Sequence, residues 1–258
     1  MPAIAKTFSR LKIEGRKAFI PYIMAGDPSI EKTEEILHLF KECGADIVEL
    51  GVPFSDPLAD GPTIQRASER ALQNGITLRK IISFVRNIRQ NLHIPIVLMT
   101  YFNPVFKYGI QDFIRDANDS GVNGVIIPDL PPDEATDFIQ LAKHAKIDTI
   151  FLLAPTSTES RIKKVIKASS GFIYYVSITG ITGASLLFDG SMDLLISNIR
   201  KYTNKPVAVG FGISTPEEAT AVSRISDGII IGSAIIKKLH ESPLELKNYL
   251  ISLREAIQ

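Results

Sequence analysis

The building unit of this chain can be read in residues 45–62, whose sequence is ADIVELGVPFSDPLADGP. Residues 45–50 are mostly apolar, as expected of a strand buried in a parallel sheet. The following turn contains three prolines and two glycines, which make it stiff. Gly61-Pro62 then starts a helix, because proline suits the first helical position. The stretch therefore predicts a strand, a rigid loop and a helix.

Similar units recur along the whole chain. Apolar runs alternate with stripes of helical period, a pattern typical of a parallel sheet covered by helices. Eight strands are predicted, at residues 19–24, 47–50, 94–99, 124–127, 149–153, 172–177, 207–209 and 228–231. Because no low-complexity linker divides the chain, we predict one α/β domain over residues 1–258, a single (β/α)8 TIM barrel with an extra N-terminal helix. An open doubly wound sheet is the alternative, but no Gly-x-Gly-x-x-Gly follows the first strand.

Composition excludes several classes of function. Lys plus Arg (29) nearly balance Asp plus Glu (28), and no basic tract occurs, so we expect no nucleic-acid partner. The start of the sequence lacks a signal-peptide pattern, and no run approaches the roughly 18 apolar residues of a membrane helix, so we expect a cytoplasmic protein without membrane contact. The single cysteine, Cys43, lies in an apolar stripe, and the four histidines lack metal-like spacing. No metal site is predicted.

The acidic residues of the opening stretch are candidate catalytic groups. Glu49 ends the second predicted strand, where burial of a carboxylate costs several kcal/mol unless the group is paired or used. In a barrel, functional groups lie at the C-terminal ends of strands and in the loops that follow, so Asp60 and Tyr174 are also candidate catalytic residues. Each has a structural alternative: an ion pair for Glu49, a helix cap for Asp60 and barrel filling for Tyr174. Asp56 is interpreted as shaping its turn.

Glycine-rich segments follow the last three predicted strands. They are Gly180–Gly183, Gly210–Ser214 and Gly232–Ala234, and their backbone N–H groups could approach an anion closely. A phosphate site after the late strands recurs in barrels, although glycine also marks ordinary turns. Residues 180–190 are long for such a connection and suit a lid. The barrel mouth has an apolar lining that suits a flat aromatic ligand or an ordinary core, namely Tyr22, Met99, Ile126, Leu152 and Phe211.

These motifs together resemble the α-subunit family of tryptophan synthase over essentially the full chain. The resemblance is carried by residues 21–28 (PYIMAGDP), by residues 49–65 and by the three glycine segments, all in family order. It implies retro-aldol cleavage of indole-3-glycerol phosphate to indole and glyceraldehyde 3-phosphate, with no metal or organic cofactor. It also implies a β subunit that takes up the indole, in an α2β2 heterotetramer.

The resemblance further implies roles for individual residues. Glu49 corresponds to the acid/base that protonates indole C3, Asp60 to the carboxylate that receives the indole N–H, and Tyr174 to the active-site tyrosine. Thr182 corresponds to the lid threonine. The implied phosphate contacts are Gly183, Gly212, Ile213, Gly232 and Ser233. To donate a proton near neutral pH, Glu49 needs a raised pKa, which burial supplies, whereas Asp60 should stay ionised.

One departure from the family pattern is visible. Well-known members carry an arginine before the lid motif, where this chain has Ile178-Thr179. Phosphate binding and lid closure are therefore expected to differ.

The implied β-subunit contact involves the loop around Pro57 and residues 103–106. Three alternatives remain: a catalytically weak regulatory subunit, a stand-alone lyase, and a sugar-phosphate isomerase on the same fold.

Overall fold

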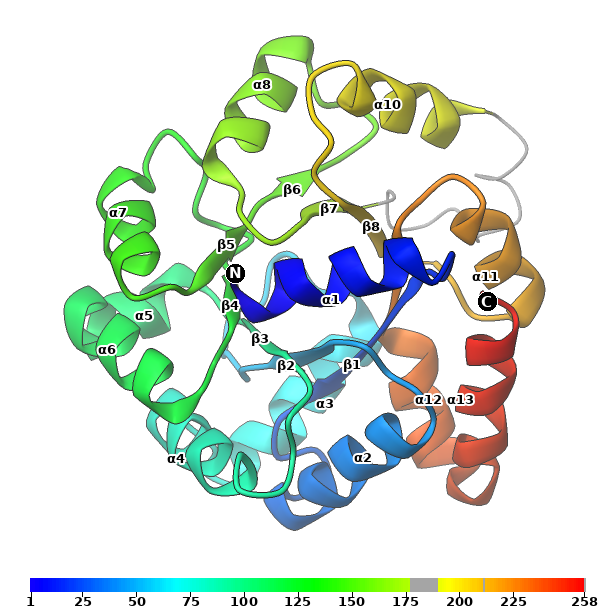
Figure 1. Ribbon diagram of the computed structural model, residues 1–258. Coiled ribbons are helices and arrows are strands. Elements are labelled where there is room, and N and C mark those ends of the chain that lie inside the picture. The colour runs from blue at the N-terminus through cyan, green and yellow to red at the C-terminus, as the bar shows by residue number, and fades with distance from the viewer. Residues whose placement is uncertain (177–189, 211, 258) are drawn as a thin grey trace.

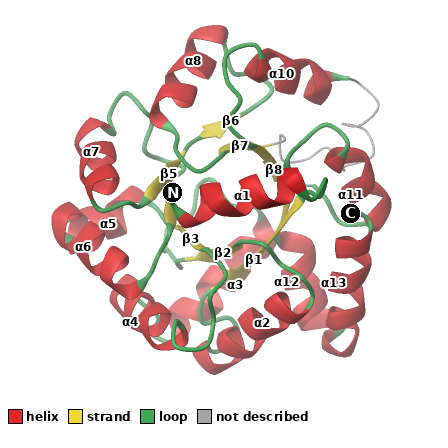
Figure 2. Ribbon diagram, viewed as in Figure 1, coloured by secondary structure: helices red, strands yellow, loops and turns green. Residues whose placement is uncertain are grey.

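The computed structural model describes residues 1–176, 190–210 and 212–257, and their strands form a parallel barrel inside a ring of helices (Figures 1 and 2). The strands follow one another around the sheet in the order β5-β4-β3-β2-β1-β9-β8-β7-β6. They are β1 (Ala18–Met24), β2 (Val48–Gly51), β3 (Ile96–Met99), β4 (Gly124–Ile126), β5 (Asp148–Ile150), β6 (Leu152–Leu153), β7 (Ile173–Val176), β8 (Val207–Gly210) and β9 (Gly228–Ile231). The predicted TIM barrel is thereby confirmed.

The fifth predicted strand, residues 149–153, is divided in the structure. β5 pairs with β4, whereas β6 pairs with β7, and Phe151 alone separates the two strands. The Tyr174 N–H donates to the Phe151 carbonyl at 3.2 Å, so the chain passes directly from one neighbouring strand to the other. The prediction of one continuous strand was therefore wrong at Phe151, because barrel closure makes this segment change its pairing partner there.

The described helices cover the outside of the barrel, apart from α1, which lies across one of its ends (Figure 1). They are α1 (Ala3–Ile13), α2 (Ile30–Glu42), α3 (Pro62–Gln73), α4 (Leu78–Ile88), α5 (Phe102–Tyr108), α6 (Ile110–Ser120), α7 (Thr136–His144), α8 (Glu159–Ala168), α10 (Ser191–Arg200), α11 (Pro216–Ser223), α12 (Ser233–Glu241), the 3-10 turn η1 (Pro243–Glu245) and α13 (Leu246–Glu255). None of the described helices is long and apolar enough to cross a membrane.

The local sequence signals explain why these helices form. In α4 an apolar stripe of helical period is buried, comprising Leu78, Ile81, Ile82, Val85 and Ile88. Ser29 and Thr77 accept the N–H groups of Lys32 and Lys80, as expected of N-caps. Thr215 and Glu218 form a capping box at the start of α11. Short-range chemistry thus sets the helix starts.

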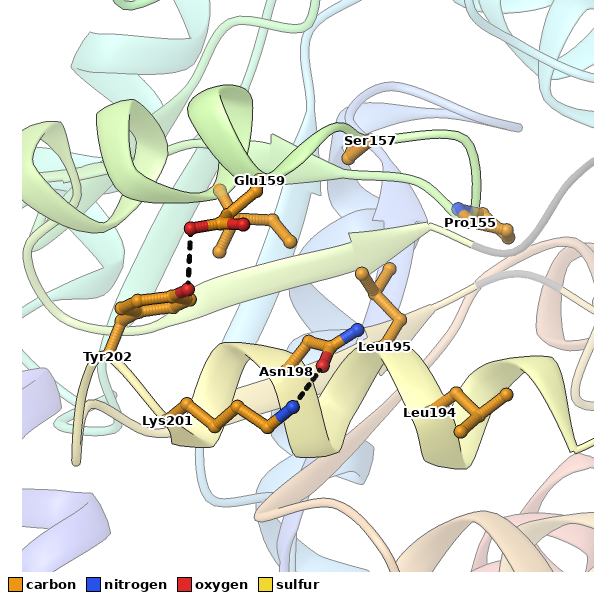
Figure 3. Close-up of a pocket in the computed structure, with 9 residues that line it drawn as sticks. Pro155, Ser157, Glu159, Leu194, Leu195, Asn198, Lys201 and Tyr202 are labelled. Atoms are coloured by element: carbon orange, nitrogen blue, oxygen red, sulfur yellow. Dashed lines mark hydrogen bonds between the residues drawn. The ribbon is translucent and has the colours of Figure 1, made fainter.

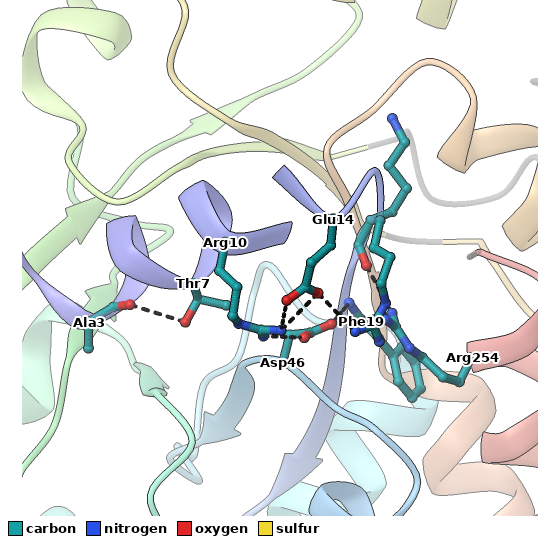
Figure 4. A network of polar contacts seen from close by, with 9 residues as sticks. Ala3, Thr7, Arg10, Glu14, Phe19, Asp46 and Arg254 are labelled. Atoms are coloured by element: carbon teal, nitrogen blue, oxygen red, sulfur yellow. Dashed lines mark hydrogen bonds and ion pairs between the residues drawn. The ribbon is translucent and has the colours of Figure 1, made fainter. Parts of the chain in front are cut away.

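A polar network fastens the end of the barrel that α1 covers (Figure 4). The buried Asp46 carboxylate accepts from Arg10 Nη2 on α1 at 3.0 Å and from the Phe19 N–H at 3.1 Å. Arg254 of α13 lies 3.3 Å from the same carboxylate. Residues at this N-terminal face of a barrel serve stability, and the opposite face is left for function.

Candidate active site

The strand register brings Tyr22 and Glu49 together near the C-terminal ends of β1 and β2. Their Cα atoms are partners in the parallel ladder, so both side chains point to the same face of the sheet. That face is the barrel interior, because burial, followed by the nearby charges of Asp60 and Glu49, raises the pKa of Tyr22. Glu49 is 1% exposed, and among the described residues its Oε2 atom has no hydrogen-bond partner.

The two carboxylates of the mouth differ in their protonation. Burial raises the pKa of Glu49 to about 8, and the negative charge of Asp60 contributes to this shift. Burial raises the pKa of Asp60 only to about 6, because a hydrogen bond from Tyr101 opposes the shift. At neutral pH Glu49 therefore carries its proton and Asp60 is mostly ionised. Two carboxyl groups whose pKa values differ in this way can serve as a proton donor and as a charged hydrogen-bond acceptor.

Tyr101 holds the loop that carries Asp60, a role that the sequence did not predict. Its Oη accepts the Ala59 N–H at 3.0 Å, and its hydroxyl donates to the Asp60 carboxylate. Its ring packs on Phe54 with centroids 5.1 Å apart. Its position in the sequence could have identified Tyr101, because it lies two residues beyond the end of β3, where barrel enzymes place functional groups.

Two glycines make room for tyrosine hydroxyls in the mouth. A Cβ at Gly51 would lie 2.2 Å from Tyr22 Oη, and one at Gly210 would lie 2.4 Å from Tyr174 Oη. Burial, together with the charges of Glu49 and Asp60, raises the pKa of both tyrosines well above the usual range. Both hydroxyls are therefore protonated donors at neutral pH.

The predicted apolar lining lies on the same part of the barrel. Met99 and Ile126 end β3 and β4 and are buried, while Leu152 on β6 is partly buried. Phe211 lies outside the described residues. The strand register places Met99 and Ile126 on the interior face that also carries Tyr22 and Glu49, and we call the described members of this set the apolar wall.

Two of the predicted phosphate-binding residues lie at the N-terminus of α12, where no side chain caps the backbone N–H groups. Gly232 is its N-cap, no side-chain cap is formed there, and Ser233, its first residue, is exposed. Gly212 has φ +80°, a left-handed conformation that favours glycine, and Ile213 beside it is buried. Thr182 and Gly183 fall outside the part of the chain that the structure describes.

The start of α11 differs from this arrangement. Glu218 Oε2 accepts the Ser214 N–H at 2.7 Å and the Thr215 N–H at 3.2 Å. The Ser214 and Thr215 N–H groups are therefore not open to an external anion, because the protein's own Glu218 carboxylate accepts both of them. The open N–H groups of α12 are the better match for an anion.

Comparison with known proteins identifies the family of this chain. The family model described as tryptophan synthase alpha chain matches residues 8–258. The chain belongs to the tryptophan synthase alpha chain family. The tryptophan synthase alpha chain of Geobacter sulfurreducens is 50% identical over 262 residues, which cover 100% of this chain and 99% of that protein. That of Thermoanaerobacter sp. is 47% identical over 263 residues, with 100% of both chains covered.

Solved structures show the same relationship. The tryptophan synthase subunit alpha of Legionella pneumophila superposes with a TM-score of 0.92 at 36% identity, covering 100% of this chain and 98% of that one. A chain of Mycobacterium tuberculosis tryptophan synthase gives a TM-score of 0.93 at 35% identity, covering 99% and 98%. The match over whole chains establishes the tryptophan synthase alpha fold for this protein.

Asp27 is another buried acid of this alpha chain that the sequence analysis did not select. It is 0% exposed and accepts from Arg70 Nε at 2.7 Å and Arg70 Nη2 at 2.8 Å, while His240 Nε2 lies 3.0 Å away. The paired carboxylate joins the loop after β1 to α3 and α12. We interpret Asp27 as a structural anchor, because its charge is already matched by Arg70.

A surface groove of about 370 Å³ between α8 and α10 contains none of the predicted alpha-chain site residues (Figure 3). Its polar groups are engaged with one another. Tyr202 Oη donates to Glu159 at 2.7 Å, and Lys201 donates to Asn198 at 2.8 Å. The candidate active site is therefore the barrel mouth around Glu49.

Proposed function

We propose that Glu49 and Asp60 carry out the lyase half-reaction of tryptophan synthase in this chain, the cleavage of indole-3-glycerol phosphate that its family catalyses. The observation that carries this assignment is the buried Glu49 carboxyl, whose pKa lies near 8 beside a second carboxyl with a pKa near 6. A general acid needs its proton at the working pH, and Glu49 retains it at neutrality.

The proposed chemistry uses Glu49 twice. Its proton goes to indole C3, which makes the ring an electron sink and weakens the bond from C3 to the glycerol chain. The electrons of that bond return to the indole as it breaks. The Glu49 carboxylate takes the proton of the glycerol hydroxyl, whose carbon becomes the aldehyde of glyceraldehyde 3-phosphate. The acid is thereby regenerated, and the atoms and charges balance.

Asp60 stabilises the positive indole ring that this proton transfer creates. Its carboxylate, oriented by Tyr101, is proposed to receive the indole N–H. An ionised acceptor at that position stabilises the charge that develops in the transition state more than the neutral substrate, which is the requirement for rate enhancement. Tyr174 is proposed as the further active-site hydroxyl.

The remaining residues are proposed to bind the two ends of the substrate. The N-terminus of α12 has uncapped N–H groups that suit the phosphate, through Gly232 and Ser233. Gly212 and Ile213, from the loop between β8 and α11, are proposed as further phosphate contacts, together with Gly183 from the segment that also carries Thr182. The indole is proposed to lie against the apolar wall, which consists of Tyr22, Met99, Ile126, Leu152 and Phe211.

The alpha chain of tryptophan synthase works with a β subunit, and we propose an α2β2 assembly in the cytoplasm. The proposed contact surface lies around Leu58 and Phe106, which are 87% and 65% exposed. Phe102 extends this surface, with its ring centroid 6.0 Å from that of Phe106. Exposed apolar side chains next to a functional loop are typical of a protein interface.

The decisive experiment measures cleavage of indole-3-glycerol phosphate by the purified chain alone and with added β subunit. We expect cleavage in both cases and faster turnover with the partner. Full activity that does not respond to the β subunit would favour a stand-alone lyase. Absence of cleavage under both conditions, with activation of the β subunit, would show a regulatory role instead.

A further inference from the structure

We propose that the Tyr22 hydroxyl is a positioning group that donates a hydrogen bond to the Glu49 carboxylate once Glu49 has given up its proton. The inference rests on the proposed role of Glu49 as the acid. Tyr22 contributes its ring to the apolar wall, and its hydroxyl has this separate polar function.

The first argument is the placement of the two side chains. Tyr22 and Glu49 are partners in the ladder between β1 and β2 and share the interior face of the barrel. The space that the hydroxyl occupies exists because residue 51 is glycine, since a Cβ there would lie 2.2 Å from Tyr22 Oη. The barrel therefore accommodates the hydroxyl, and not merely an aromatic ring, next to Glu49.

The second argument is the hydrogen bonding of these buried groups. The Tyr22 hydroxyl bonds to the Met24 thioether sulfur at 4.0 Å, and Tyr22 is 5% exposed. A thioether is a weak acceptor, so this bond is readily given up for a carboxylate. Within the described residues, Glu49 Oε2 has no partner. A weakly engaged donor thus lies beside an unengaged acceptor.

The third argument is what the reaction requires. After proton transfer to indole C3, Glu49 becomes a buried anion near the negative Asp60, and burial disfavours that state. Among the described residues, the protonated groups that face the carboxylates are Tyr22, Tyr101 and Tyr174. Tyr101 is engaged with Asp60 and Ala59. Tyr174 lies against Gly210 of β8 and faces Glu49 from β7, because after burial the Glu49 charge raises the pKa of Tyr174 more than the Asp60 charge does. Tyr22 is the one that the register places beside Glu49.

The substitution Tyr22→Phe tests this directly, because it removes the hydroxyl and keeps the ring. We expect kcat for indole-3-glycerol phosphate cleavage by the complex with the β subunit to fall about tenfold, the scale of one hydrogen bond to a charged group. KM should change less than about twofold, because the apolar wall is kept. Loss of the donor also raises the pKa of Glu49, so the alkaline limb of the kcat profile should move to higher pH.

Two comparisons make the result decisive. Tyr108→Phe removes a surface hydroxyl that donates to Asp116 at 2.7 Å, and it should leave kcat and its pH profile unchanged. In a Glu49→Gln background, where no carboxylate forms, Tyr22→Phe should lower the residual single-turnover rate no further. An unchanged kcat and alkaline limb in Tyr22→Phe, or a full additional loss in the double variant, would overturn the proposal for Tyr22. Wild-type turnover in Glu49→Gln would instead remove the proposed function itself.

Discussion

Glu49 and Asp60 show how position alone separates two carboxyl groups of similar intrinsic acidity. Glu49 is fixed on β2 in the barrel interior, whereas Asp60 lies on a loop and accepts a hydrogen bond from Tyr101. Burial favours the neutral acid in both, and the hydrogen bond partly restores the charge of Asp60. The third acid of the stretch, Asp56, is exposed, and its carbonyl accepts the Leu58 N–H within the turn.

At this scale we expect Glu49→Gln and Asp60→Asn each to lower kcat for indole-3-glycerol phosphate cleavage by about 10² or more. Each variant keeps the shape of the side chain and removes the proton donor or the charged acceptor. Steady-state kinetics with the β subunit present provide the measurement. Glu69→Gln is the matched control, because Glu69 is an exposed glutamate on α3. Equal losses in all three variants would contradict specific roles for Glu49 and Asp60.

The raised pKa of Glu49 also predicts how stability depends on pH. The folded pKa of about 8 exceeds the ordinary value of 4.5, so the unfolded chain binds fewer protons at Glu49 between these limits. The free energy of unfolding therefore falls as pH rises through this window, and the stabilising contribution is lost above pH 8. We expect Glu49→Gln, which stays neutral, to melt at a higher temperature than the wild type at pH 9.

That comparison is made by thermal unfolding at pH 5 and pH 9. The advantage of Glu49→Gln should be larger at pH 9, and Glu69→Gln should show no such dependence. A constant difference between Glu49→Gln and wild type at both pH values would mean that the Glu49 pKa is not raised by folding.

At the scale of single elements, α11 and α12 follow neighbouring strands of the same sheet but differ at their N-termini. Glu218 fills the N-terminus of α11, whereas α12 begins at an uncapped glycine. Both helices carry the same favourable end for an anion, since this property belongs to any helix N-terminus. The two helix ends differ because the Glu218 side chain accepts backbone N–H groups at the start of α11, whereas no side chain does so in α12.

We therefore expect Ser233→Asp to raise KM for indole-3-glycerol phosphate by about tenfold or more. An aspartate in the first turn is compatible with the helix, but its charge repels the phosphate. Ser233→Asn is the control of nearly equal size without the charge, and its KM should rise less. Steady-state kinetics at low ionic strength measure both. If Ser233→Asp bound substrate like the wild type, the phosphate would have to bind elsewhere.

At the scale of the whole molecule, the two ends of the barrel have different tasks. One end is closed by α1 and by the Asp46 network, and the other holds the carboxylates and the exposed Leu58 and Phe106. The candidate active site and the proposed partner surface therefore share one face. This proximity would let a bound β subunit restrain the Asp60 loop.

We expect Phe106→Asp to weaken binding of the β subunit by at least about tenfold, because a charge would be buried at the interface. Ile13→Asp provides the control, since Ile13 is an apolar residue that is 87% exposed at the end of α1. Titration of the β subunit by calorimetry measures both affinities. Equal affinity for Phe106→Asp and Ile13→Asp would exclude this face as the contact surface.

The amino-acid sequence by itself determined the alternation of strands and helices, the helix caps and the position of Glu49 at a strand end. These features depend on residues within a few positions of one another, whose periodicity and backbone preferences act locally. The family resemblance also rests on such short motifs, which is why the expected site residues could be named in advance.

Only the tertiary structure decided which groups meet. The division at Phe151 arises from closure of the barrel, and the pairs Tyr101 with Ala59 and His240 with Asp27 span 42 and 213 residues of chain. The pairing of Tyr22 with Glu49 likewise depends on strand register. No local pattern encodes such contacts, because they form only when distant strands are aligned, and alignment is set by packing of the entire barrel.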